Sequence, residues 1–461
     1  MSFERLYPRL PVGLQNLAVS YEGWRIQQRR YAPAFHATLR TLEAQSFLSP
    51  EEVARVRDER LSRFIEHAVR HVPYYRDLFR ERGLAPADIR GLDDLQALPI
   101  LDNRAVRENP ARFMAEGGVD EPTLVAKTSG STGSPLKFPY TPSSHREQWA
   151  VWWRFRRWHG LELHEPCMVF GGRSVVPITQ RRPPYWRTNR PGRQLLFSAY
   201  HLGPETAPAY LERMKRCGMR WIHGFPSQVA LLARYALELK VTLPIRWVTL
   251  GSENMLPPAL MTIEQAFGVK PLHHYGMAEG VANISLCPHG ALHVDEDYAA
   301  TEFIPRGNGA AAVVGTNFTN PAYPLLRYDV GDLITLSDHA CDCGRPGRVV
   351  GRIDGRQDDY VITARGVRLG RLGHVFRHVN NIQEAQIRQR EPGKITIRIV
   401  PRPGFSAADE QRLAAQVRER MGDDMGFEIE QVDSLPRTAS GKLRLVVTEL
   451  EESRIDREPI R

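Results

Sequence analysis

The sequence predicts an α/β protein with a large N-terminal domain, residues 1–354, and a small α+β C-terminal domain, residues 355–461. From Arg220 onward, short apolar strands alternate with helices, which is typical of a parallel sheet with crossover helices. After residue 355 the pattern changes to two successive strands, a helix and a last strand, in a unit large enough to fold by itself. The length of 461 residues also favours more than one domain.

The first 100 residues or so are expected to be the helical part of the N-terminal domain. Ser49-Pro50-Glu51-Glu52 is a typical helix start, because a capping serine, a first-turn proline and two acids suit the positive helix end. This helix should reach about Val72, and Pro73 should end it. Further helices are predicted over 143–159, 227–239, 257–267 and 407–421, and strands over 221–223, 245–250, 270–274, 385–389, 395–400 and 427–432. The periodicity of residues 1–48 is unclear.

Composition narrows the class of partner. The chain has no run of about 18 apolar residues and no N-terminal signal pattern, and its five cysteines are too few and odd in number for a disulfide framework. We therefore expect a cytoplasmic protein without a membrane partner. The net charge of +9 suits anionic small ligands. The arginines between 181 and 193 are the best nucleic-acid patch, but they lie in no recognisable binding module, so no nucleic-acid partner is expected.

One stretch, residues 127–138, combines glycines, hydroxyls and lysine in a way that predicts a phosphate-binding loop. Glycine can adopt positive φ, so the backbone amides can turn inward, where hydroxyls and an ammonium add further donors. The spacing differs from that of P-loop NTPases, because no Ser or Thr follows Lys137. Taken alone, a flexible surface loop is the alternative. The candidate residues are Thr128, Ser129, Gly130, Ser131, Thr132, Gly133 and Lys137.

Five further polar clusters follow along the chain. Ligands bind beyond the carboxyl ends of parallel strands, and the clusters at 251–254 and 275–279 follow predicted strands in this way. Singly, each also fits a strand end, a turn, a linker or a surface loop. The clusters are Gly251-Ser252-Glu253-Asn254, Tyr275-Gly276-Met277-Ala278-Glu279, Arg327-Tyr328-Asp329-Val330-Gly331-Asp332, Gly355-Arg356-Gln357-Asp358-Asp359 and Pro436-Arg437-Thr438-Ala439-Ser440-Gly441-Lys442.

In this order, the loop and the clusters resemble the motifs of the adenylate-forming superfamily, which includes acyl-CoA synthetases, luciferases and peptide-synthetase adenylation domains. Val72-Pro73-Tyr74-Tyr75, Leu98-Pro99-Ile100 and Cys341-Asp342-Cys343-Gly344-Arg345 resemble the phenylacetate-CoA ligase and CapK-like branch. The resemblance spans nearly the whole chain. It implies an N-terminal adenylate-forming domain with mixed sheets and a mobile C-terminal lid domain, with the active site between them.

The resemblance also implies a reaction. A carboxylate would attack the α-phosphate of ATP to give an acyl-adenylate and pyrophosphate, and a thiol of coenzyme A or of carrier-protein phosphopantetheine would then displace AMP. Such a site must neutralise charge and align its reactants. Alternatives are a CapK-like enzyme with an amine or hydroxyl acceptor and a degenerate adenylate-binding protein without turnover. The expected partners are a small carboxylate, ATP and, for a carrier-bound thiol, an acyl carrier protein; the chain would be a monomer or a homodimer.

Residue roles follow from the resemblance alone. Lys137 and the loop residues would hold the β- and γ-phosphates, and Glu279 would bind Mg²⁺, which prefers oxygen ligands. Asp332 would accept both ribose hydroxyls. Lys442 would contact the carboxylate and the α-phosphate, a task suited to a flexible ammonium. Glu253, Tyr275 and Gly276 would lie against adenine, Arg356 would contact the ribose, and the nucleotide would also contact Ser252 and Met277. The Gly-Arg-x-Asp pattern occurs twice, so Arg352 is the alternative to Arg356 as the ribose contact.

Cysteine and histidine suggest a metal site. Cys341-x-Cys343 alone is a weak signal, because zinc pairs usually have at least two intervening residues. A further thiol, Cys287, and two imidazoles, His289 and His293, lie in the region 287–293. Some phenylacetate-CoA ligase-like proteins hold a structural zinc in these two regions. We therefore expect a structural Zn²⁺ on Cys287, His293, Cys341 and Cys343, with His289 as a substitute ligand. Cysteines without metal are the alternative.

Overall fold

A computed structural model describes residues 6–127, 136–171, 175–177, 179–253, 255, 257–306, 309–356, 361–364, 368–369, 372–376, 379, 381–421, 425–437 and 443–450. The side chains of residues 103, 127, 258, 356, 368, 373, 374 and 420 lie outside this description. The chain divides into two compact units. Unit 1 consists of Met1–Cys167, Arg187–Leu195 and Leu272–Ile353, and unit 2 consists of Met168–Trp186, Leu196–Pro271 and Asp354–Arg461.

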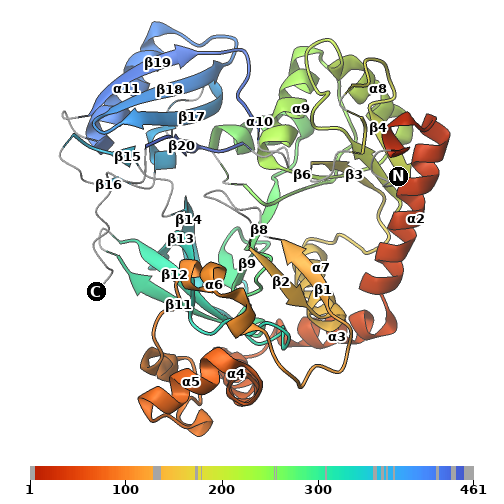
Figure 1. The fold of residues 1–461 in the computed structure, drawn as a ribbon. Coiled ribbons are helices and arrows are strands. Elements are labelled where there is room, and N and C mark those ends of the chain that lie inside the picture. Colours follow the sequence, from red (N-terminus) through yellow and green to blue (C-terminus); the bar gives the residue numbers. More distant parts are fainter. Residues whose placement is uncertain are drawn as a thin grey trace. The chain divides into compact units, whose positions relative to one another are not determined.

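Unit 1 begins with helices (Figure 1). Its α-helices are α2 (Val12–Arg30), α3 (Pro33–Gln45), α4 (Pro50–His71), α5 (Pro73–Arg82), α6 (Asn103–Glu108) and α7 (Pro142–Trp158). Helix α4 starts as predicted. Ser49 Oγ accepts from the Glu52 amide at 3.2 Å, and the Glu52 carboxylate accepts from the Ser49 amide at 2.8 Å, which completes a capping box. Residues 1–48, which have no clear periodicity, form α2 and α3 over most of their described length.

The sheet of unit 1 runs β11-β12-β13-β14-β10-β9-β8. Its strands are β8 (Leu272–Gly276), β9 (Asn283–Leu286), β10 (Leu292–Val294), β11 (Ala299–Pro305), β12 (Ala311–Asn317), β13 (Tyr328–Leu336) and β14 (Val349–Arg356). The pairs β8/β9, β9/β10, β10/β14, β11/β12 and β12/β13 are antiparallel. A separate hairpin joins β1 (Leu124–Lys127) to β2 (Lys137–Tyr140). The buried core includes side chains of α4, α5 and this sheet, such as Phe64, Tyr75, Ile284 and Val313.

Helix α7 carries tryptophans and arginines, and its contacts form a core face covered by arginine stems. Trp153 is 3% exposed, and the Arg156 guanidinium lies over its ring at 5.0 Å. Arg30 of α2 covers the ring of Trp149 at 3.4 Å. None of the described helices is long and apolar enough to cross a membrane.

Unit 2 contains the predicted parallel pair. β6 (Trp221–Gly224) runs parallel to β7 (Trp247–Leu250), and helix α9 (Pro226–Glu238) connects them. The helices α8 (Ala207–Cys217) and α10 (Pro257–Phe267) also belong to this unit. Strands β3 (Cys167–Phe170), β4 (Trp186–Asn189) and β5 (Gln194–Phe197) lie where the chain passes between the units.

The C-terminal part of unit 2 forms its own four-stranded sheet in the order β19-β18-β17-β20 (Figure 1). Its strands are β17 (Ile382–Glu391), β18 (Lys394–Pro401), β19 (Gly426–Gln431) and β20 (Val446–Thr448), beside the short pair β15 (Val361–Ile362) and β16 (Arg368–Leu369). Leu413 and Val417 of α11 (Ala407–Met421) are buried with β17 and β18 residues, so this part has an apolar core.

Two strand predictions need correction. The strand expected over 270–274 is β8, which begins and ends two residues later. The strand at 426–431 is not the last, because β20 follows and pairs parallel with β17. Only three residues long, β20 offers too short an apolar run to be found by periodicity.

Candidate functional site

Two of the predicted nucleotide-binding side chains lie in direct contact. Tyr275 is in β8 and Asp332 is in β13, and the Tyr275 hydroxyl donates to Asp332 Oδ2 at 2.7 Å. A carboxylate has about four lone-pair positions, so this bond leaves Asp332 able to accept from further hydroxyls. Gly331, at φ +74°, provides the preceding turn, and its amide donates to Asp329 Oδ1 at 2.8 Å. Burial raises the pKa of Asp329, although that amide bond acts in the opposite direction.

The segment after β8 contains Gly276, Met277 and Glu279. Two side chains from elsewhere in unit 1 hold its backbone. Gln148 Nε2 donates to the Met277 carbonyl at 2.7 Å, and Asn317 Nδ2 donates to the Glu279 carbonyl at 3.1 Å. The backbone that carries Glu279, the predicted magnesium ligand, is therefore braced from α7 and from β12.

Gly276 lies where a side chain would not fit. It pairs with Asn283 across β8 and β9, and an added Cβ would lie 2.6 Å from Asn283 Oδ1. That oxygen accepts from Trp152 Nε1 at 3.0 Å. Sequence reasoning missed Gln148, Trp152 and Asn283 as supports, because they lie far from the motif or look like ordinary core residues. Only the fold identifies them.

The predicted phosphate loop lies mostly outside the described residues, which exclude Thr128, Ser129, Gly130, Ser131, Thr132 and Gly133. Its two ends are described. Lys127 closes β1 and Lys137 opens β2, and the two residues are direct cross-strand partners. Lys137 is exposed.

Ser252 and Glu253 follow β7 in unit 2. Ser252 is exposed and has φ +70°, an uncommon conformation for a non-glycine residue and one that clusters at functional sites. The Glu253 carboxylate accepts from the amide and the hydroxyl of Ser227, at 3.0 and 3.1 Å, and from the Leu443 amide at 2.8 Å. Burial raises its pKa, and these bonds oppose the rise. The adenine contact predicted for Glu253 is not tested by these bonds.

The predicted contacts of Lys442, Arg356 and Arg352 differ in how much of each residue the structure describes. Lys442 lies outside the described residues, and so does the side chain of Arg356, whose backbone ends β14. The alternative ribose contact, Arg352, donates to Thr335 Oγ1 at 3.2 Å. Arg327 pairs with Glu302 at 3.0 Å and donates to the Leu98 carbonyl at 2.5 Å. Arg327 therefore links the segment around Leu98 to the sheet of unit 1.

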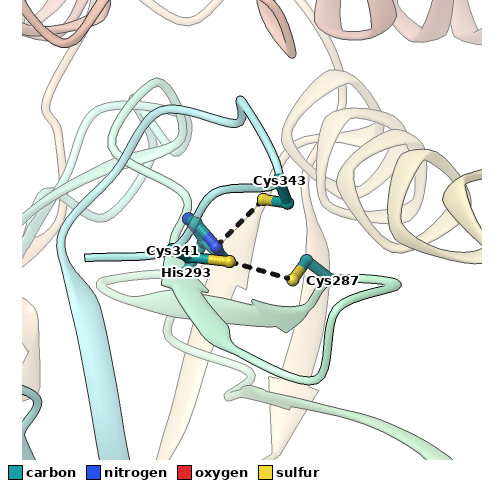
Figure 2. A group of neighbouring side chains, drawn as sticks. All are labelled: Cys287, His293, Cys341 and Cys343. Carbon is teal, nitrogen blue, oxygen red and sulfur yellow. Dashed lines mark hydrogen bonds between the residues drawn. The ribbon is translucent and has the colours of Figure 1, made fainter. Parts of the chain in front are cut away.

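The four predicted zinc ligands come together (Figure 2). One ligand atom from each of Cys287, His293, Cys341 and Cys343 lies within 4.8 Å of the other three. Cys287 Sγ is 3.8 Å from Cys341 Sγ, and Cys343 Sγ is 3.4 Å from His293 Nε2. Two segments supply them. Cys287 and His293 flank the β9–β10 turn, and the cysteine pair precedes β14, which pairs with β10 at His293.

The chemistry of this cluster suits a zinc ion. His293 Nδ1 lies 3.2 Å from the Pro346 carbonyl, so Nδ1 carries the hydrogen and the Nε2 lone pair faces the sulfurs. Burial lowers the pKa of His293, which favours the neutral imidazole that binds metals. Three thiols and one imidazole are a common tetrahedral zinc set. The substitute His289 lies instead with Cys341 and Asp342, and its Nδ1 is 2.8 Å from the exposed Asp342 carboxylate.

Burial and hydrogen bonding shift the pKa values of the two thiols of the Cys-x-Cys pair in opposite directions. Burial raises the pKa of Cys341 to about 11, and the side-chain contacts with Cys343 and Cys287 act in the same direction. Burial also acts to raise the pKa of Cys343, but hydrogen bonds from the Arg345 amide and from Cys341 outweigh it and lower that pKa. The donated bonds at Cys343 stabilise a thiolate, the form of cysteine that binds metal.

Comparison with known proteins gives relatives along nearly the full chain. Residues 361–449 match the family model of the CapK C-terminal domain. Protein CapK of Staphylococcus aureus is 23% identical over 455 residues, covering 96% of this chain and 99% of that protein. The phenylacetate-coenzyme A ligase of Thermus thermophilus is 25% identical over 459 residues, covering 87% of this chain and 97% of that ligase.

Solved structures show the same architecture. The crystal structure of 2-hydroxyisobutyryl-CoA ligase in the postadenylation state, in complex with R3-HIB-AMP, matches with a TM-score of 0.69 at 20% identity. The match covers 88% of this chain and 91% of that one. The chain is therefore a homologue of CapK and of the phenylacetate-coenzyme A ligases, and it has the fold of the adenylate-forming superfamily.

Proposed function

We propose that the chain is an ATP-dependent, AMP-forming ligase that activates a carboxylate as an acyl-adenylate and transfers the acyl group to a thiol. In the first step a carboxylate oxygen forms a bond to the α-phosphorus as pyrophosphate leaves. In the second, a thiolate forms a bond to the acyl carbon as AMP leaves with the carboxylate oxygen. The phenylacetate-coenzyme A ligases among its relatives support the thiol acceptor.

The observation that carries this proposal is the contact between Tyr275 and Asp332. The two residues come from separate predicted nucleotide motifs, and the fold brings them to one place. A phenol that orients an acceptor-only carboxylate suits the recognition of a ribose diol, since both ribose hydroxyls can donate to it. The adjacent backbone, braced by Gln148, would present Met277 beside the same nucleotide.

The remaining roles concern charge. Lys127 and Lys137 stand at the ends of the predicted phosphate loop and would favour the triphosphate there. Glu279 would hold Mg²⁺, which neutralises phosphate charge when bound. Lys442 would contact the carboxylate and the α-phosphate. Arg356, with Arg352 as the alternative, would contact the ribose. Fixed positive groups of this kind stabilise the charge that develops as pyrophosphate departs.

Pyrophosphate release from ATP and Mg²⁺ tests the proposal. The panel of acids would include aryl, fatty, hydroxy and amino acids, each with and without coenzyme A. We expect pyrophosphate release that depends on one class of carboxylate and rises with coenzyme A. The matched variant is Asp332→Asn, in which a neutral amide of nearly the same size replaces the carboxylate proposed to accept the ribose hydroxyls. ATP binding without release by any acid would leave the degenerate binder as the better account.

The acyl acceptor has a second candidate. The C-terminal domain matches the CapK family model, and the chain covers 99% of CapK itself. A CapK-like transfer to an amine or hydroxyl would give pyrophosphate release that coenzyme A does not stimulate. A carrier-bound thiol would require an acyl carrier protein in the assay. The same panel, repeated with each acceptor, separates these cases.

We also propose a structural Zn²⁺ at Cys287, His293, Cys341 and Cys343. The support is the approach of the four ligand atoms within 4.8 Å and the fixed tautomer of His293. Because Cys287 and His293 flank the β9–β10 turn and the cysteine pair precedes β14, bound zinc would link that turn to the segment before β14. This link would lie in the part of unit 1 that follows the Tyr275–Glu279 motif in the sequence.

A further inference from the structure

Glu253 makes a contact that its predicted place beside adenine does not explain. Its carboxylate joins two parts of unit 2 that are 190 residues apart in the sequence. Oε2 accepts from the Ser227 amide at 3.0 Å, and Oε1 accepts from both the Ser227 hydroxyl and the Leu443 amide, at 3.1 and 2.8 Å. The acceptor is thus shared between the start of α9 and the C-terminal segment.

The first part of this contact is a favourable place for a carboxylate. Pro226 and Ser227 are the first residues of α9, whose N-terminal amides have no partner within the helix. A negative charge at a helix N-terminus is stabilised by the helix dipole. Glu253 is therefore held by α9 through both of its oxygens, and Oε1, which accepts one bond from the Ser227 hydroxyl, has a second lone pair for a further donor.

The second part of the contact lies where the two ends of the motif that contains Lys442 come together. Arg437 and Leu443 form an isolated antiparallel bridge. The Arg437 guanidinium pairs with Glu384 of β17, whose side chain is 7% exposed. One end of the motif is thus tied to the C-terminal sheet, and the other end is tied to Glu253.

A second polar contact joins the same parts of unit 2. The Arg402 guanidinium, just after β18, donates to Thr262 Oγ1 on α10. Helices α9 and α10 both contact β17. The Glu253–Leu443 bond therefore belongs to a docked arrangement of the C-terminal sheet. It differs from the other contacts because its donor is the backbone of the residue that directly follows Lys442 in the sequence.

We propose that Glu253 is a positioning residue for adenylate formation, which docks the C-terminal segment through the backbone amide of Leu443. The inference rests on the proposed function and assigns Glu253 this docking task in its first half-reaction, in place of the adenine contact predicted for it. A backbone donor makes the contact independent of side-chain identity at position 443. Transfer of the acyl group from a finished adenylate should not need this bond, because Lys442 is assigned to adenylate formation only.

The test compares the two half-reactions in the full-length protein. Glu253→Ala should lower the turnover rate of adenylate formation at least 30-fold, while the KM for ATP changes less than threefold. Transfer from a synthetic acyl-adenylate to the acceptor should stay within threefold of the unsubstituted protein. Glu253→Gln, which keeps one acceptor oxygen, should restore part of the lost rate. Ser227→Ala is the matched control, because it removes the hydroxyl bond and leaves the Leu443 bond, and should change neither rate more than threefold.

A backbone substitution isolates the bond itself. Replacing Leu443 by the corresponding α-hydroxy acid converts its amide N–H to an ester oxygen and leaves Glu253 and α9 untouched. This ester should lose adenylate formation selectively, as Glu253→Ala does, and it remains informative if Glu253→Ala does not fold. Equal loss in both half-reactions, a tenfold rise in the KM for ATP at constant turnover, or an ester as active as the amide would each overturn the inference. Failure of the unsubstituted protein to form any adenylate would overturn the proposed function instead.

Discussion

The Tyr275 hydroxyl donates to the Asp332 carboxylate at 2.7 Å, and this bond joins β8 to β13 within unit 1. Hydrogen bonds to charged groups contribute about 1.5–3 kcal/mol. If Asp332 binds the ribose, Tyr275→Phe should raise the KM for ATP about tenfold and leave turnover at saturating ATP nearly unchanged, because the carboxylate loses its orientation and not its charge. Steady-state pyrophosphate release at varied ATP measures both constants.

Tyr75→Phe is the matched control for that substitution. Its hydroxyl donates to the Pro324 carbonyl at 3.1 Å and accepts from the Leu326 amide at 2.9 Å, in the buried core of the same unit. Removing it should lower stability by about 1–3 kcal/mol and leave the KM for ATP unchanged. If Tyr275→Phe behaved like Tyr75→Phe, the contact would be structural only.

Zinc content provides a second prediction. Protein purified without added metal should contain about one equivalent of zinc, and Cys341→Ser should lower both the zinc content and the melting temperature, since structural zinc contributes folding free energy. Cys217→Ser is the control, because Cys217 donates to the Met214 carbonyl and lies outside the cluster. Elemental analysis with thermal unfolding measures both. Less than a tenth of an equivalent in the unsubstituted protein would contradict the site.

The buried ion pairs of Arg154 on helix α7 should contribute strongly to the free energy of unfolding. Arg154, 4% exposed, pairs with Asp295 at 2.7 Å and with Asp297 at 2.5 Å, and both carboxylates are buried. Removing one partner of a buried pair costs about 3–5 kcal/mol, because the other charges stay buried without compensation. Arg154→Met should therefore lower the free energy of unfolding in urea by about that amount.

The control lies one turn along the same helix. Arg157 pairs with Glu43 at 2.8 Å, but both side chains are about a third exposed, at 34% and 30%. Exposed pairs contribute about 0–1 kcal/mol. Arg157→Met should therefore cost no more than that. Similar losses for the two arginines would show that burial does not set the strength of these pairs.

Stability should fall in mild acid because of buried histidines. Burial lowers the pKa of His145 to about 3, with Arg30 acting in the same direction, and burial lowers the pKa of His273 to about 4. The unfolded chain takes up these protons near pH 6.5, and the folded chain does not. Stability is therefore full above about pH 6.5 and declines below it, by about 1.4 kcal/mol per pH unit for each histidine.

His145→Gln should remove the contribution of this histidine to that decline, about 1.4 kcal/mol per pH unit between pH 6.5 and 4.5. The amide oxygen of Gln can replace His145 Nε2 as acceptor for Trp149 Nε1, a bond of 3.1 Å, without taking up a proton. His164→Gln, at an exposed position, is the control and should leave the pH profile unchanged. Urea unfolding across this pH range measures the slope. An identical slope in His145→Gln would contradict the assignment.

Local rules predicted much of the fold. The capping box at Ser49 fixed the start of α4, and the apolar periods of 257–267 and 407–421 gave α10 and α11 at their observed bounds. The strand at 270–274 was displaced by two residues because its register is set by pairing with β9, a tertiary effect. The bounds of the helices before residue 48 could not be predicted within the expected helical part, because α2 has only two buried residues, Gln15 and Gly23, and so has almost no apolar stripe toward the core.

The candidate site was predictable to the extent that its residues form local motifs. The grouping of Cys287 and His293 with the cysteine pair at 341 and 343 was expected from the family resemblance, and the fold brings the four side chains together. Contacts that depend on topology could not be predicted. Gln148 reaches Met277 across 129 positions, and Glu253 reaches Leu443 across 190. A single sequence carries no signal for such pairs.

The most direct test of the central claim follows an oxygen atom. A carboxylate substrate identified by pyrophosphate release would be labelled with ¹⁸O in its carboxyl group and turned over with ATP, Mg²⁺ and the acceptor. Because the acyl-adenylate joins a carboxylate oxygen to the α-phosphorus, one labelled oxygen should appear in each AMP, as mass spectrometry would measure. Label in ADP or inorganic phosphate, or unlabelled AMP, would contradict an acyl-adenylate intermediate.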